Sequence, residues 1–259
     1  MLCDKVPKRI IARIDVKSGR VVKGVMMEGV NPVGDPIKIS RKYYQEGIDE
    51  IILLDTVASL YKRLELPDII AEIVKDVFVP VCAGGGVTSC QEAEKLFHSG
   101  ADKICVNTGA LRDPELIKNL SKEFGSQSVV LQLDARLINS EFRVFYNTGR
   151  DLSDLNIAEW LRIAQDNGIS EALPTSIEKD GTGKGPDLEL IEFVGKHVKV
   201  PVIYGGGIAS IKHIDSVISG NHASGVALAS YLHVDGKSIS DIKSALELSG
   251  YLMRQDITL

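Results

Sequence analysis

The sequence predicts an α/β protein folded as one (β/α)8 TIM barrel that is built from two half-barrel repeats. Three observations favour this fold. Short β-branched apolar runs alternate with amphipathic stretches of helical length, which is typical of a parallel sheet covered by helices. Eight such units fit into 259 residues, close to the roughly 250 residues of a closed barrel. Segments of the first half also return in the second half at a nearly constant offset.

The expected strands are short runs rich in Ile, Val and Leu, bounded by polar residues or glycine. They cover 10–16, 50–55, 78–83, 102–107, 128–134, 170–175, 200–205 and 224–228. The expected helices carry apolar residues at three- and four-residue steps and cover 61–76, 88–98, 112–124, 157–167, 187–197 and 238–248. These units predict a single domain over residues 1–259. A doubly wound open sheet is the alternative, although the G-x-G-x-x-G pattern that would support it is missing.

The internal repeat is visible as matching letters. VPVCAGGGVTS at 79–89 returns as VPVIYGGGIAS at 200–210, and GIDE at 47–50 returns as GISE at 168–171, both 121 residues later. Asp15, at the end of the first expected strand, returns as Asp134 after 119 residues. GGG and Gly-Ile are frequent at strand–helix junctions, but three matches in one register favour two half-barrels of four βα units each, which were fused or duplicated.

Composition excludes several classes of protein. The net charge is −5, from 30 basic and 35 acidic residues, and the basic residues are scattered, so a nucleic-acid partner is not expected. No apolar run approaches the roughly 20 residues of a membrane span and no signal peptide is visible, so we expect a cytoplasmic protein. Cys3, Cys82, Cys90 and Cys105 form no CxxC pair, which favours reduced thiols over a zinc site or a disulfide.

Two aspartates are the candidate catalytic residues. In a (β/α)8 barrel the functional face lies at the carboxyl ends of the strands, and Asp15 and Asp134 end the first and fifth strands, which face each other. Two opposed carboxylates suit general acid and general base catalysis if their surroundings push their pKa values apart. Alternatively, each aspartate caps a loop or pairs with a lysine such as Lys23.

Two glycine runs are the candidate phosphate sites. Residues 84–86 and 205–207 end the third and seventh strands, and glycine lets backbone N–H groups approach an anion closely. Small polar residues follow the next strands, and a third glycine segment follows the sixth strand: these are Asn107-Thr108, Ala229-Ser230 and Asp180-Gly181-Thr182-Gly183. The matched pair predicts a ligand with a phosphate at each end, whereas glycines needed only for tight turns are the alternative.

Four charged residues fall at strand beginnings, around the bottom of the barrel: Arg9, Glu50, Lys103 and Glu171. Ordinary solvated charges are the simpler interpretation of their spacing. A gate made of two cations and two anions is the alternative, at the desolvation cost that burial of charges carries.

In eight segments the chain resembles the cyclase subunit family of imidazole glycerol phosphate synthase, HisF. The segments are RIIARIDVKSGRVVKG (9–24), GDP (34–36), GIDEIILLDTVAS (47–59), AGGGV (83–87), GADKICVNTGA (100–110), FGSQSVVLQLDAR (124–136), PTSIEKDGT (174–182) and GGGI (205–208). They occur in the family's order over essentially the whole chain. The sister isomerase of histidine biosynthesis shares the half-barrel repeat and the aspartates, but LLDTVAS and GSQSVV are similar to the cyclase.

The resemblance implies a lyase that takes ammonia from a glutaminase (HisH-like) subunit docked at the amino-terminal face of the barrel. Its substrate is the bis-phosphorylated ribulosyl formimino aminoimidazole carboxamide ribotide. The products are imidazole glycerol phosphate, on the histidine pathway, and aminoimidazole carboxamide ribotide. No metal or organic cofactor is expected, because proton transfer and electrostatics suffice for this chemistry.

The resemblance also implies residue roles: Asp134 as general acid, Asp15 as general base, and Arg9, Glu50, Lys103 and Glu171 as a salt-bridge gate for ammonia, in place of the solvated charges that spacing favours. The implied substrate-binding residues are Lys23, Gly86, Asn107, Thr108, Thr175, Asp180, Gly181, Gly206, Gly207, Ala229 and Ser230.

Departures from the family pattern cluster at the expected mouth. Arg13 stands where the family usually has a small cysteine; two residues before Asp15, it should face the barrel interior, pair with Asp15 or Asp134, and depress the pKa of that carboxyl. Pro174 is expected to interrupt the sixth strand. These changes support an alternative function, a HisF-like subunit that conducts ammonia to a sugar amidotransferase of surface-polysaccharide synthesis with little or no cyclase activity.

Overall fold

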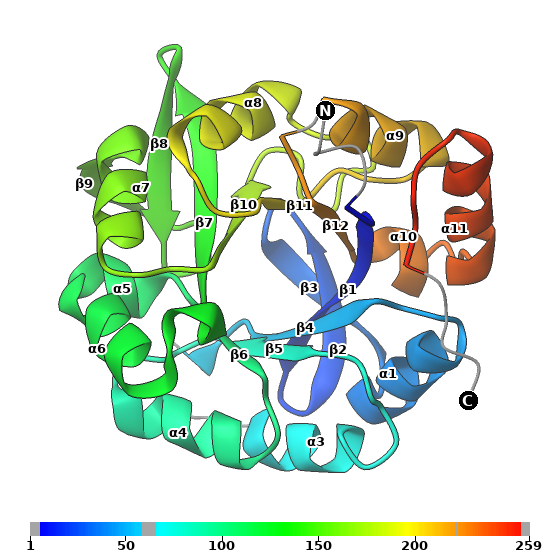
Figure 1. Ribbon diagram of the computed structural model, residues 1–259, viewed down its shortest axis with the longest axis horizontal. Coiled ribbons are helices and arrows are strands. Elements are labelled where there is room, and N and C mark those ends of the chain that lie inside the picture. Colours follow the sequence, from blue (N-terminus) through cyan, green and yellow to red (C-terminus); the bar gives the residue numbers. More distant parts are fainter. Residues whose placement is uncertain (1–5, 59–65, 221, 255–259) are drawn as a thin grey trace.

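The computed structural model describes residues 6–58, 66–220 and 222–254. Eight parallel strands form a closed barrel in the order β1, β4, β5, β6, β7, β10, β11 and β12, and β12 pairs with β1. Figure 1 shows the helices arranged around these strands, with the β2–β3 hairpin across the centre of the view. The predicted (β/α)8 barrel is confirmed.

The barrel strands are β1 (Arg9–Lys17), β4 (Glu50–Asp55), β5 (Val81–Gly84), β6 (Lys103–Val106), β7 (Val129–Ile138), β10 (Glu171–Ser176), β11 (Ile203–Gly205) and β12 (Gly225–Leu228). Two hairpins add β2 (Arg20–Val25), β3 (Glu28–Gly34), β8 (Glu141–Tyr146) and β9 (Asp151–Asn156). The helices are α1 (Pro36–Gln45), α3 (Leu66–Ile73), α4 (Cys90–His98), α5 (Thr108–Arg112), α6 (Glu115–Phe124), α7 (Ile157–Asp166), α8 (Leu188–His197), α9 (Ile211–Ser219), α10 (Ser230–His233) and α11 (Ile239–Leu248), with a 3-10 turn, η2 (Ser126–Ser128).

The two halves repeat the same succession of elements. Each half has a long first strand (β1 or β7), a hairpin, and then alternating helices and strands that end in a short and a long helix (α5–α6 or α10–α11). The residues before the two short helices even share an unusual backbone conformation, with φ −138° and ψ −86° at Asn107 and φ −125° and ψ −86° at Ala229. This agreement is what the sequence repeat predicts for two half-barrels.

The predicted strands match the barrel strands, whereas several helices differ from the predicted ones or were not predicted. The stretch 112–124 is split, because Pro114 lacks the N–H that a continuous helix would use, so α5 ends at Arg112 and α6 begins at Glu115. Helix α1 was not predicted, although Asp35 caps it by accepting from the Lys38 N–H and Pro36 occupies its first turn. Helix α9 and both hairpins were also missed, and part of the predicted helix 61–76 lies outside the described residues.

The expectation that Pro174 interrupts the sixth strand is wrong. Strand β10 runs through it, and Pro174 pairs with Leu133 of β7. Ala172 donates its N–H toward the β11 side, to Pro201, and by the two-residue period of a strand the Pro174 nitrogen faces that side too. The register between β10 and β11 is limited to Thr175 with Gly205 and a bridge from Ala172 to Val202, so the missing donor breaks no ladder bond.

Apolar side chains fill the barrel on both sides of the sheet. The larger cluster lies between strands and helices, and a smaller one fills the lumen: Ile11, Ile52, Leu54, Cys82, Cys105, Val130, Leu173, Ile203 and Ala227. Cys82, Cys90 and Cys105 are free thiols, whereas Cys3 lies outside the described residues. In the part of the chain that the structure describes, no helix is both long and apolar enough to cross a membrane.

Candidate active site

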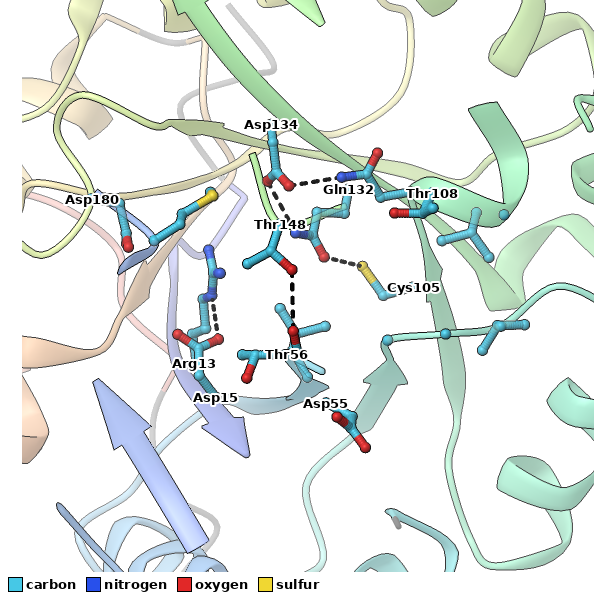
Figure 2. Close-up of a pocket in the computed structure, with 18 of the residues that line it drawn as sticks. Arg13, Asp15, Asp55, Thr56, Cys105, Thr108, Gln132, Asp134, Thr148 and Asp180 are labelled. Carbon is cyan, nitrogen blue, oxygen red and sulfur yellow. Dashed lines mark hydrogen bonds and ion pairs between the residues drawn. The ribbon is translucent and has the colours of Figure 1, made fainter. Parts of the chain in front are cut away.

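The two predicted catalytic carboxylates lie in one cavity at the carboxyl ends of the barrel strands. Four strand steps separate β1 from β7 in either direction around the barrel, so Asp15 and Asp134 come from opposite sides. Both are buried, with 6% and 1% of their surface exposed, and both line a cavity of about 80 Å³. Figure 2 shows them around this shared space, with Asp180 on one side and Cys105 and Thr108 on the other.

Asp134 is held by neutral hydrogen-bond donors. Its Oδ2 accepts from Asn107 Nδ2 at 2.7 Å, and its Oδ1 accepts from Gln132 Nε2 at 3.0 Å. Burial raises the pKa of Asp134 to about 6, and the hydrogen bond from Gln132 and the charge of Arg13 oppose this only in part. The carboxyl group therefore gains and loses its proton close to neutral pH.

Asp15 has cationic neighbours instead. Arg13 Nε lies 3.0 Å from its Oδ1, and Lys23 Nζ lies 3.5 Å from its Oδ2. Burial alone would raise the pKa of Asp15, but the charges of Arg13 and then Lys23 outweigh it, so the net shift is downward. The two carboxylates, which their positions at strand ends do not distinguish, thus have opposite pKa shifts.

Arg13 lies inside the barrel, as its position two residues before Asp15 predicts. It is 6% exposed and pairs with Asp15, and its Nη1 donates to Thr175 Oγ1 at 3.1 Å. Thr175 is fully buried behind the guanidinium and does not itself line the mouth cavities. Because Arg13 binds Asp15 directly, Asp134 keeps its raised pKa.

Lys23 reaches the mouth from the β2–β3 hairpin. Its Nζ lies 3.0 Å from both carboxylate oxygens of Asp180. The hairpin is anchored there because Met26 donates its N–H to the Asp180 carbonyl at 2.8 Å, and Gly181 approaches Gly24 so closely that a Cβ would lie 2.1 Å from the Gly24 carbonyl oxygen. The predicted residues Lys23, Asp180 and Gly181 therefore form one packed unit.

The two glycine runs lie in different halves of the mouth. Gly86, Asn107 and Thr108 line the 80 Å³ cavity. A second cavity of about 20 Å³ is lined by Gly181, Gly206, Gly207, Ala229 and Ser230, with Arg13, Lys23 and Asp180 as its charged residues. Gly206 and Gly207 have φ of +113° and +75°, and a Cβ at Gly207 would lie 2.1 Å from the Gly185 carbonyl oxygen, so close packing alone requires glycine there.

The four charged residues at the strand beginnings meet in a closed ring at the amino-terminal end of the barrel. Arg9 lies 2.9 Å from Glu50 and 2.6 Å from Glu171, and Lys103 lies 3.0 Å from Glu50 and 2.6 Å from Glu171. Glu50 and Glu171 are 2% and 7% exposed. Spacing alone favoured solvated charges, and that interpretation is wrong for these carboxylates. Between this charged ring and the mouth lies the apolar lumen cluster.

Three parts of the site were not predicted. Gln132 lies two residues before Asp134, so strand alternation could have placed it inside. The β8–β9 turn covers the first half of the mouth: Asn147 donates its N–H to Thr108 Oγ1 at 3.0 Å, and Thr148 Oγ1 donates to the Thr56 carbonyl at 3.1 Å. A turn reaching from a neighbouring hairpin leaves no local signal in the sequence.

The third missed part is His233, on α10. Its Nε2 lies 2.9 Å from the Arg13 carbonyl oxygen, which can only accept, so Nε2 carries the proton and Nδ1 accepts from the Tyr43 hydroxyl at 2.6 Å. Burial lowers the pKa of His233, which keeps the ring neutral. The sequence shows an isolated histidine here, and only the fold brings it to strand β1.

Comparisons with known proteins point to one family. The family model "Histidine biosynthesis protein" matches residues 9–237. The chain is similar to imidazole glycerol phosphate synthase subunit HisF of Thermobifida fusca (39% identical; 95% of this chain, 98% of that protein) and of Pyrobaculum aerophilum (40%; 95% and 98%). The same subunit of Legionella pneumophila is 41% identical to this chain, and the match covers 80% of this chain and 98% of the Legionella protein. The chain belongs to the HisF subunit family of imidazole glycerol phosphate synthase.

Proposed function

We propose that this chain is the cyclase subunit of imidazole glycerol phosphate synthase, a lyase that uses ammonia to convert the bis-phosphorylated ribulosyl formimino aminoimidazole carboxamide ribotide. Its products are imidazole glycerol phosphate and aminoimidazole carboxamide ribotide. The observation that carries the proposal is the pair of opposed, buried carboxylates with opposite pKa shifts in a mouth that has a glycine run in each half.

Asp134 is the general acid and Asp15 the general base in this proposal. A carboxyl group with a pKa of about 6 is partly protonated near neutral pH and can donate, while Asn107 and Gln132 fix the orientation of its two oxygens. Asp15 stays ionised beside Arg13 and Lys23 and can accept a proton. Acid and base then act from opposite walls of the cavity.

The phosphate groups of the substrate bind at the two ends of the mouth. In one half the backbone around Gly86 and the polar residues Asn107 and Thr108 are available, and in the other Gly181, Gly206, Gly207, Ala229 and Ser230. Glycine backbone N–H groups can donate to phosphate oxygens without steric hindrance from a Cβ. Lys23, beside both cavities, supplies a cation to the middle of the ligand.

A glutaminase subunit docks at the amino-terminal face and delivers ammonia through the charged ring into the apolar lumen. Large apolar side chains are exposed near the strand beginnings: Phe78, three residues before β5, is 72% exposed, Val6, three residues before β1, is 62% exposed, and Leu252, beside the bridge from Lys8 to Met253, is 50% exposed. Exposed apolar residues around a charged centre are typical of a protein–protein interface. The lumen cluster suits passage of neutral ammonia rather than ammonium.

The test is turnover by the purified chain supplied with the ribotide and an ammonium salt, with no partner present. Release of imidazole glycerol phosphate supports the proposal, provided that Asp134→Asn abolishes it. A chain that binds the ribotide and leaves it unchanged over a wide range of ammonium concentration would overturn the proposal.

Arg13 favours a second candidate function, an ammonia-conducting subunit with little cyclase activity that supplies a sugar amidotransferase. The guanidinium occupies the top of the lumen and lowers the pKa of Asp15, which weakens that carboxylate as a base. In this case the parent chain is inactive with ammonium, and Arg13→Cys gains turnover because both effects are removed.

A further inference from the structure

Arg13 is part of the wall that divides the mouth. With Lys23 and Asp180 it lines both the 80 Å³ cavity and the 20 Å³ cavity. Lys23 is held firmly in this wall, since its ammonium group lies 3.0 Å from each oxygen of Asp180. Arg13 is held less firmly than Lys23, because its direct contacts are one ion pair with Asp15 and one hydrogen bond to the neutral hydroxyl of Thr175. Arg13 is therefore the member of the wall that a ligand can draw away most easily.

Arg13 lies where the second cavity meets the first. The second cavity is the narrower of the two, about 20 Å³ against about 80 Å³, so a phosphate group seated in it comes close to the guanidinium. On the opposite side the backbone is tightly packed, because a Cβ at Gly207 would clash with the Gly185 carbonyl oxygen. A side chain of the wall can therefore adjust to the anion more readily than this backbone.

Chemistry also favours movement of Arg13 toward an anion in the second cavity. A guanidinium binds two phosphate oxygens at once, with a geometry that its single Nε contact to Asp15 does not use. The phosphate brings up to two negative charges, whereas Asp15 brings one and is already shared with Lys23. The exchange therefore improves the pairing of Arg13 and leaves Asp15 with Lys23.

We propose that Arg13 is a phosphate-binding and specificity-determining residue: a phosphate group seated at Gly206, Gly207 and Ser230 takes the guanidinium from Asp15 and joins the two cavities. The phosphate at this end of the ligand is then a requirement for catalysis, since a ligand without it leaves Asp15 paired with Arg13. This inference rests on the proposed function for the identity of the ligand, but its test requires only inorganic phosphate.

The first experiment follows the Nε–H signal of Arg13 by ¹⁵N–¹H NMR while inorganic phosphate is added, with the signal assigned by its loss in Arg13→Gln. We expect the signal to move in step with the backbone amide signals of Gly206 and Gly207. Sodium chloride at equal ionic strength is the control and should not move it. An Nε–H signal that stays in place while the two glycine signals titrate would overturn the proposal.

The second experiment compares phosphate affinities measured from the Gly206 and Gly207 amides. Arg13→Gln should weaken binding roughly ten- to a hundredfold, the range for a lost hydrogen bond to a charged group, while Arg13→Lys should retain part of the affinity. Arg162→Gln removes an exposed arginine from α7 and should change nothing. Equal weakening in Arg13→Gln and Arg162→Gln would show a general charge effect and overturn the proposal.

Asp15→Asn gives the sharpest comparison, because it removes the competitor for Arg13. Binding of phosphate should become tighter in Asp15→Asn, and this gain should vanish in the double variant with Arg13→Gln. A gain that persists without Arg13 would show that Lys23 or the general potential is responsible, and the proposal would fail. These binding results are independent of turnover, so failure of cyclase activity and failure of this inference are separate outcomes.

Discussion

Asn107 donates its side-chain amide to Oδ2 of Asp134 at 2.7 Å across the neighbouring strands β6 and β7. The other end of the same amide, Asn107 Oδ1, is buried and has no hydrogen-bond partner among the residues that the structure describes. Rotation of this amide by 180° would offer an acceptor in place of the donor. Position 134 can therefore hold either a carboxylate or an amide without losing its contact with Asn107.

Asp134→Asn should remove ammonia-dependent turnover while leaving the fold intact. The amide fits the same hydrogen bonds but cannot transfer a proton, and a general acid contributes roughly 10²–10⁴ in rate. Steady-state assays with ammonium salt and circular dichroism measure the two effects. Asp166→Asn, at an exposed ion pair on α7, is the control and should retain parental turnover. Parental activity in Asp134→Asn would contradict the assigned role.

The same variant should be more stable than the parent at neutral pH. Asp134 has a pKa of about 6 in the folded chain and about 3.9 when unfolded, so the native state holds its proton more tightly and the free energy of unfolding falls as pH rises from about 4 to 6. The asparagine side chain of the variant carries no charge and avoids this loss of about 1–3 kcal/mol. Urea unfolding at pH 7 should show the gain, and at pH 4 the two proteins should differ little. An equal difference at both pH values would exclude ionisation as its cause.

Glu171→Gln should affect delivery of ammonia more than its chemical use. The change breaks both ion pairs of Glu171 and leaves Arg9 and Lys103 to share Glu50. We expect a loss of about 1–3 kcal/mol in the free energy of unfolding, less than for a fully buried pair because the two cations are about one-fifth exposed. With the glutaminase partner present, the ratio of glutamine-driven to ammonium-driven turnover should change. Glu115→Gln, at an exposed pair with Lys118, is the matched control and should leave both quantities unchanged.

Gly85→Ala should destabilise the chain far more than Gly236→Ala. Both glycines have positive φ, +98° and +63°, so an alanine meets backbone strain of about 1 kcal/mol or more at either position. At Gly85 the added Cβ would also lie 2.1 Å from the Asp55 carbonyl oxygen, whereas nothing lies within 4 Å at Gly236. Thermal unfolding of the two variants compares these positions directly. Equal losses would show that backbone conformation, not close packing, requires glycine at position 85.

The barrel could be predicted because its signals are local and repeated. Apolar runs predicted the eight strands, and the 121-residue offset between repeated segments predicted the two halves. The opposed aspartates and the inward direction of Arg13 followed from strand ends and the two-residue period. The choice of partner did not follow: Arg13 was equally compatible with Asp15 and Asp134, and only side-chain packing decides between them.

Contacts made by segments far apart in the chain could not be predicted. His233 reaches the Arg13 carbonyl across 220 residues, and the β8–β9 turn reaches Thr108 across 39. Each depends on where a loop lies after the barrel has closed, which no periodicity encodes. The charged ring shows the same limit, since spacing alone could not distinguish solvated charges from four mutually paired ones.

The charged ring draws unequally on the two halves of the chain. The first half contributes Arg9, Glu50 and Lys103, and the second contributes Glu171, the repeat partner of Glu50. Two first halves would bring four cations against two carboxylates, and two second halves would bring two carboxylates with no cation. If the chain were cut near Gly125 and the fragments were produced together, charge would favour the mixed pair over either like pair. The charges of the ring therefore favour pairing of the first half with the second, so the two halves are not interchangeable at this end of the barrel although they repeat the same succession of elements.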